Sequence, residues 1–124
     1  MVPSIAPSPI FSAQMQRAQG ALVRASLVLA EAAERGNLSK KEQEWALKSA
    51  ERARAAIAAV LSNPTGVSAM AQQHLRVAYG ALQDAVEQIK RGDPVQSVLV
   101  SVQKRVGESL AHVRKSVAIM TPNA

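Results

Sequence analysis

The chain has 124 residues, enough for a single domain built around one hydrophobic core. It carries a formal net charge of +6 and no cysteine, which excludes disulfides, thiolate metal sites and cysteine nucleophiles. Hydrophobic residues make up 48% of the chain, yet it contains only one Trp, one Tyr and one Phe. This composition favours helices, because alanine has the highest helix propensity and aromatic residues are enriched in strands.

The first residues predict a short extended tail. Pro3, Pro7 and Pro9 lie there, and proline cannot continue a helix and restrains the residue before it. The stretch lacks the basic region of a secretory signal peptide, and no part of the chain is apolar over the roughly 20 residues that a membrane helix needs. We therefore expect a cytoplasmic protein without membrane association, with a tail over residues 1–9 and a helical bundle over residues 10–121.

Two amphipathic helices are expected in the first half of the chain. In the first, over residues 11–35, apolar residues recur at alternating spacings of four and three: Phe11, Met15, Ala18, Leu22, Ala25, Leu29 and Ala32. Gly36 ends this helix. Ser39 and Glu42 form a capping box that begins the second helix. The second helix ends in the turn-forming stretch 62–66, after an apolar stripe of Ala46, Ala50, Ala53, Ile57 and Val60.

The second half of the chain predicts two more helices. The third runs from about Ser68 to "KRGD", with a stripe of Ala71, Leu75, Ala78, Leu82, Ala85 and Ile89. The fourth begins with Asp93 as the N-cap, Pro94 at the first helical position and Gln96 reaching back to the cap. Its stripe consists of Leu99, Val102, Val106, Leu110, Val113, Val117 and Met120.

Four amphipathic helices with short connections predict an all-α fold, an antiparallel four-helix bundle with a short extended N-terminal tail. The helix ends also resemble each other. The first helix ends in "ERGN" and the third in "KRGD", and the second ends near "SNP" and the fourth in "MTP". Either two helical hairpins share a common design, or helix ends simply share a preference for Gly and Asn. We favour the second explanation.

An enzyme is not expected from these residues. A metal site needs three or four converging ligands, and the only histidines, His74 and His112, are predicted on different helices. The chain contains no phosphate-binding glycine loop and no nucleophile motif. We therefore predict no catalytic residues, no metal site and no cofactor.

One spacing nevertheless resembles a catalytic motif. Arg105 and His112 lie two turns apart on one face of the fourth helix. In the HEPN-like ribonucleases, which this pair resembles, such residues from two protomers meet at a dimer cleft. Here no polar residue directly follows the arginine, and Glu108 offers His112 an ion-pair partner one turn away. We expect an ordinary surface pair and rank the ribonuclease third among the functions.

The basic residues predict a surface suited to acidic partners. Arg17 and Arg24 share a face of the first helix, and Lys48, Arg52 and Arg54 are crowded on the second. No continuous basic run occurs, and aromatic residues for base stacking are missing. A basic nucleic-acid-associated protein that binds phosphates weakly is our second hypothesis, and a solvated surface without a ligand is the alternative.

Three segments resemble the flagellin export chaperone family. "GALVRASLVLAEAAERG" resembles the end of the family's first long helix, "KKEQEWALKSAERARAAIAAVL" is similar to the second, and "LRVAYGALQDAVEQIKRGD" resembles the third. The resemblance extends from Ser8 to about Val113 and implies a bundle that holds an aggregation-prone export substrate around it. The family's N-terminal tyrosine motif, its first-helix aromatics and its final tryptophan are absent here.

These observations predict a non-enzymatic bundle that binds a helical or disordered segment of another protein, as an export or secretion chaperone or an adaptor. The sequence leaves a homodimer open. The partner would lie in a groove formed by apolar residues that the core stripes leave over: Val28, Trp45, Leu47, Val77, Tyr79 and Val98. Alternatively, these residues widen the core stripes.

Overall fold

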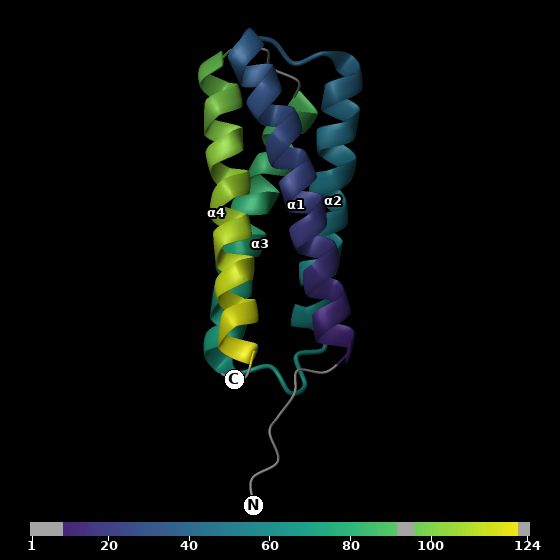
Figure 1. Cartoon of the computed structure of the whole chain (residues 1–124), viewed down its shortest axis with the longest axis vertical. Helices are drawn as coiled ribbons and strands as arrows, with labels where there is room; N and C mark the ends of the chain where they lie inside the picture. Colours follow the sequence, from purple (N-terminus) through teal and green to yellow (C-terminus); the bar gives the residue numbers. More distant parts are fainter. Residues whose placement is uncertain (1–8, 92–95, 122–124) are drawn as a thin grey trace, which may run out of the picture.

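The computed structural model describes residues 9–91 and 96–121. It contains four α-helices and no strand among these residues: α1 (Pro9–Arg35), α2 (Lys40–Ser62), α3 (Ala69–Arg91) and α4 (Gln96–Met120). Successive helices run in opposite directions, and each helix packs against two neighbours in the order α1, α2, α3, α4 around the bundle (Figure 1). The predicted all-α antiparallel four-helix bundle is therefore confirmed.

The helix bounds differ from the expected ones at the start of α1. The helix begins at Pro9, two residues before the expected Phe11, so Pro9 belongs to the bundle and not to the tail. Proline suits the first helical position, where its missing N–H would have no acceptor within the helix. The predicted breaks after α1 and α2 are present, and α3 ends at Arg91. The cap expected at Asp93 and Pro94, and the rest of the predicted tail, lie outside the described residues.

Hydrogen bonds close the connection between α1 and α2 at both helix ends. Gly36 has a φ of 79°, a left-handed conformation that glycine adopts without steric cost. The N–H groups of Gly36 and Asn37 both donate to the carbonyl oxygen of Ala32, at 2.9 and 3.1 Å. At the start of α2, Ser39 and Glu42 each donate a backbone N–H to the other's side chain at 3.1 Å. The predicted capping box is confirmed.

The apolar stripes of α1, α2 and α3 are buried throughout, as their periodicity predicted. Many of the contact positions are alanines with no exposed surface, among them Ala18, Ala25, Ala46, Ala50, Ala53, Ala71, Ala78 and Ala85. Small side chains at these positions let neighbouring helix axes approach closely. The larger aliphatic side chains, such as Leu22, Ile57 and Leu82, fill the interior between the helices.

The buried positions of α1 recur sixty residues later in α3. Phe11, Met15, Ala18, Ala21, Leu22, Ala25 and Leu29 correspond to Ala71, Leu75, Ala78, Ala81, Leu82, Ala85 and Ile89. The tripeptide Gly-Ala-Leu occupies residues 20–22 and again residues 80–82. The similarity between the helix ends thus extends to the core-facing surface of α1 and α3.

The stripe of α4 differs from the predicted one, because two serines enter the core. Ser109 and Ser116 are fully buried. Their hydroxyl groups donate to the carbonyl oxygens of Ala78 at 2.9 Å and Ala71 at 3.1 Å, both in α3. Burial of a hydroxyl group is tolerated when it is hydrogen-bonded. Three residues of the predicted stripe are only partly buried: Leu110, Val117 and Met120.

The alanine contacts generate the first prediction. Ala25→Leu and Ala78→Leu should each lower the free energy of unfolding by about 1–3 kcal/mol, because both positions are fully buried and cannot take a larger side chain without strain. Ala111→Leu, on the exposed face of α4, is the matched control and should change it by less than about 0.5 kcal/mol. Urea unfolding measures all three, and unchanged midpoints in both core variants would refute this packing.

A second prediction concerns Glu42, whose carboxylate also pairs with Arg35 at the end of α1. The Arg35 guanidinium and the Ser39 N–H lower the pKa of Glu42 to about 2 from 4.5. Because this pKa is lower in the folded chain, the stabilisation is complete above pH 4.5 and is lost as the pH falls towards 2. The stability difference between the parent and Glu42→Gln should therefore disappear over that range in urea unfolding. A difference that is independent of pH contradicts the assignment.

Candidate functional site

The candidate site is a groove between α1 and α2, which we call the α1–α2 groove. It consists of two hollows lined by Gln14, Arg17, Arg24, Leu27, Val28, Trp45, Lys48, Ser49, Arg52, Ala55, Ala56 and Ala59. Arg52 lines both hollows, so they adjoin along the helix pair. Gln14 and Val28 lie 14 positions apart on α1 (28 − 14). At the rise of an α-helix, the groove is about 21 Å long.

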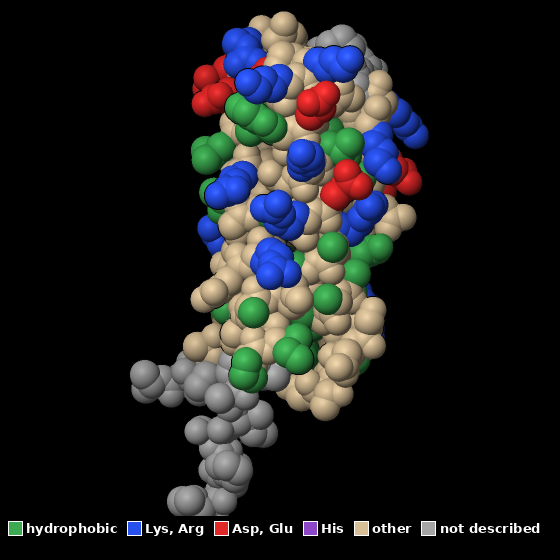
Figure 2. Space-filling model, turned by 90° about the vertical axis from the view of Figure 1, so that its right-hand side faces the viewer, with side chains coloured by type: hydrophobic (Ala, Val, Ile, Leu, Met, Phe, Trp, Pro, Cys, Tyr) green, Lys and Arg blue, Asp and Glu red, His purple; other side chains and the backbone are tan. Residues whose placement is uncertain are grey.

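Four cations along the groove have no acidic partner among the described residues. Arg17, Arg24, Lys48 and Arg52 make no ion pair with any acidic side chain that the structure describes. Figure 2 shows the α2 side of the bundle, where Lys and Arg side chains gather over the upper and middle part of the surface. Uncompensated positive charge along a concave surface attracts anionic ligands and raises their local concentration.

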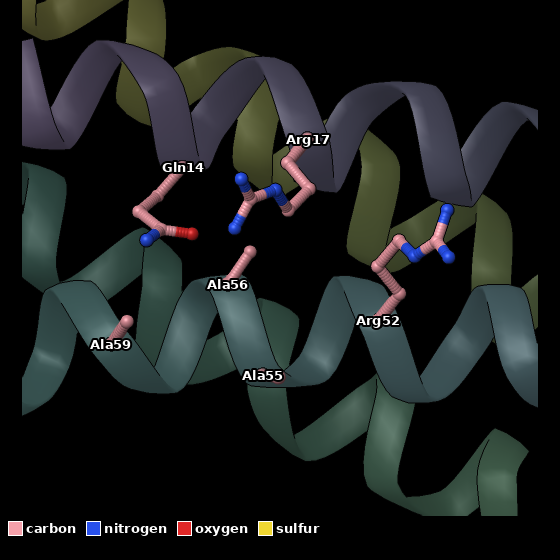
Figure 3. A pocket seen from close by; sticks show the side chains of 6 residues that line it. All are labelled: Gln14, Arg17, Arg52, Ala55, Ala56 and Ala59. Carbon is pink, nitrogen blue, oxygen red and sulfur yellow. The ribbon is translucent and has the colours of Figure 1, made fainter.

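At the end of the groove nearer the start of α1, two arginines line the same hollow from opposite helices. Gln14 and Arg17 extend from α1 towards α2, and Arg52 extends from α2 towards α1 (Figure 3). Ala55, Ala56 and Ala59 form the α2 wall of this hollow. Their methyl groups leave the guanidinium groups uncovered. A guanidinium group presents several N–H donors in one plane, which matches the two oxygens of a carboxylate.

At the other end of the groove, apolar side chains are exposed beside the cations. Leu27 is 63% exposed and Trp45 is 53% exposed, while Val28 is partly buried against the core. The Lys41 ammonium lies 5.2 Å from the centre of the Trp45 ring. Trp45 therefore presents an aromatic surface that is partly exposed to solvent and bordered by positive charge. Exposed apolar clusters of this kind, rimmed by polar groups, mark interaction surfaces.

The structure brings two of the six predicted partner-binding residues together, because Val28 and Trp45 line the same hollow. Leu47, Tyr79 and Val98 are partly buried against the core, and Val77 is 43% exposed on α3. The sequence did not single out Leu27, which lies beside Val28 in the groove. The sequence did show that basic residues share one face of α1 and one face of α2. It did not show the register of α1 against α2, which places those two faces side by side.

A second cluster of titratable groups lies between α3 and α4, outside the groove. The Nδ1 atoms of His74 and His112 are 3.0 Å apart, and the ring centres are 5.2 Å apart. The distance between the ring centres is close to the distance between the Nδ1 atoms plus the radii of the two rings. Both Nδ1 atoms therefore lie near the line that joins the ring centres, and they point at each other. One ring must donate its proton and the other must accept it. Burial, followed by the charges of Lys115 and His74, lowers the pKa of His112, against a smaller opposing effect of Glu108.

This pairing corrects the expected partner of His112. Glu108 accepts from the Arg105 guanidinium at 3.4 Å, whereas His112 faces His74 across the helix interface. The serine hydrogen bonds join α4 to α3 in the same register that places the two imidazoles opposite each other. Within the described part of the chain, no group of three or more His, Asp or Glu side chains is arranged to hold a metal ion.

No described helix combines the length and the apolar character needed to cross a bilayer. No protein-family model, curated protein or solved structure matches the chain. The resemblance to flagellin export chaperones therefore stays a prediction that rests on the three segments quoted above.

The histidine contact generates a third prediction. The pKa of His112 is lower in the folded chain than its ordinary value of 6.5. The stability that the neutral imidazole provides is therefore complete above pH 6.5, and it is lost as the pH falls through the pKa that His112 has in the folded chain. A double-mutant cycle of His74→Ala and His112→Ala, measured by urea unfolding, should give a favourable coupling above pH 6.5 that disappears in acid. A coupling that persists in acid would show that ring packing, and not the shared proton, joins the two residues.

Proposed function

We propose that the chain is a non-enzymatic bundle that binds a helical segment of another protein in the α1–α2 groove. The observation that carries the proposal is the continuity of an apolar cluster with a row of cations that have no acidic partner among the described residues. In this cluster Leu27 and Trp45 are exposed and Val28 is partly buried. An amphipathic helix binds such a surface by laying its apolar side chains in the groove and its polar flanks along the rim. A groove of about 21 Å suits a segment of about 14 helical residues.

An export or secretion chaperone, or an adaptor, is the form of this function that we favour. Such a protein holds an aggregation-prone helical segment by covering its apolar face until a later component takes it over. The resemblance of three segments to flagellin export chaperones supports this role. The lack of cysteine is compatible with the reducing cytoplasm, where we propose that the protein acts.

A nucleic-acid-associated protein is the second candidate, because the four unpaired cations of the groove would also suit phosphates. The groove contains one aromatic residue, Trp45, and its other end is lined by alanines. It therefore lacks the series of aromatic surfaces on which successive bases stack. The ribonuclease ranks third, since Arg105 and His112 are engaged with Glu108 and His74.

The test of the proposal uses a designed amphipathic peptide of about 14 residues, with leucines on one face and glutamines on the other. We expect saturable binding that perturbs backbone NMR resonances of α1 and α2. Leu27→Asp and Trp45→Asp should each weaken binding by about tenfold or more, because they place a charge in the apolar end of the groove. Val77→Asp is the matched control, since Val77 is an exposed apolar residue on α3.

Two outcomes would count against this function. The first is equal binding by the parent, Leu27→Asp and Trp45→Asp. The second is loss of binding in the Val77→Asp control alone, which would move the site to α3. Circular dichroism of each variant checks that the exposed substitutions leave the bundle folded.

A further inference from the structure

We infer that the partner helix is acidic, that Arg17 and Arg52 line the subsite that receives one of its carboxylates, and that Arg24 faces a second. This inference rests on the proposed function and adds the chemistry and the orientation of the bound segment. The observation that supports it is that two arginines from opposite helices line one hollow without an acidic partner among the described residues. The Arg17 side chain is turned towards Gln14, and the Arg52 side chain is turned the other way along the groove (Figure 3).

Charge complementarity selects the occupant. A helix without carboxylates lying on the groove would remove water from the cations without supplying any negative charge, so it would bind less tightly than an acidic helix. Carboxylates would compensate this loss through charge-assisted hydrogen bonds to the guanidinium groups. A second copy of the chain is a poor occupant, because its net charge of +6 opposes its association with a basic groove.

The order of side chains along α1 predicts the pattern of the partner. Arg17 and Arg24 are seven residues apart, and Leu27 follows three residues later. A second helix lying alongside has the same rise per residue. Its matching face would therefore carry two carboxylates about two turns apart and a bulky apolar residue about one turn beyond the second.

The walls of the groove also predict how the partner is oriented. The hollow at Arg17 and Arg52 is walled by Ala55, Ala56 and Ala59, whose small side chains permit close approach of another helix. The hollow at the other end offers the exposed indole of Trp45. The acidic end of the segment should therefore lie over the alanines, and its bulky apolar residue should lie over Trp45.

The experiment compares three peptides of about 14 residues that share one apolar face. The first carries two glutamates seven residues apart and a leucine three residues after the second. The second has glutamines in place of the glutamates. The third has the same composition as the first, but its two glutamates lie along the other flank of the apolar face. Isothermal titration calorimetry measures the Kd of each peptide, and a short DNA duplex serves as the competing anion.

The first peptide should bind at least about tenfold more tightly than the second or the third. Arg17→Gln and Arg52→Gln should each reduce this preference by weakening binding of the first peptide, and neither should weaken binding of the glutamine peptide. Arg114→Gln, an exposed arginine of α4, is the matched control and should preserve the preference. Added salt should weaken binding of the first peptide more than binding of the second.

The possible failures are distinguishable. Equal affinity for the first two peptides, with continued sensitivity to Leu27→Asp, overturns the acidic subsite and leaves the helix-binding function in place. Equal affinity for the first and third peptides also overturns the predicted orientation and subsite. Insensitivity of all three peptides to Leu27→Asp refutes the proposed function itself. Tighter binding of duplex DNA than of the first peptide, lost in Arg17→Gln and Arg52→Gln, would assign these arginines to phosphates.

Discussion

The structure depends on close contacts between helices that are made through alanine. Buried alanines stand at the contact positions of α1, α2 and α3, and the core contains few aromatic side chains. Because an alanine side chain is short, neighbouring helices can approach until backbone groups of one come within reach of side chains of the next. The hydrogen bonds from Ser109 and Ser116 to alanine carbonyl oxygens of α3 are possible only at such short range.

The small volume of the alanine side chains also produces the groove. Ala55 and Ala59 lie on the rim of the contact between α1 and α2, where larger residues would cover the gap. Gln14 and the two arginines Arg17 and Arg52 extend across it, so the gap is lined with positive charge and is left open between the helices. The apolar end, at Leu27 and Trp45, adds the contact area that charge alone does not supply.

The fold was predictable from the sequence, because apolar spacing and helix-end signals agree along most of the chain. The stripe of α1, the capping box of Ser39 and Glu42, and the stop at Gly36 all lie where the pattern placed them. Periodicity within one helix carries no information about the register between two helices. The pairing of His74 with His112 and the burial of Ser109 depend on that register, and both were missed.

The candidate site was predictable only in part, for the same reason. The sequence identified cations on shared helix faces and named Trp45 as a candidate groove residue, and it could not show that these faces lie opposite each other. It also treated Val77 and Val28 alike, although they lie on different helices and only Val28 lines the groove. A surface built from two helices appears only when the packing of both is known.

We propose that a partner helix lies in the α1–α2 groove. Intermolecular nuclear Overhauser contacts between the folded chain and the bound acidic peptide test it most directly. We expect contacts from the peptide's apolar residue to the indole of Trp45, and from its acidic end to the methyl groups of Ala55 and Ala59. Contacts that instead map to Val77 and the outer face of α3 would contradict it.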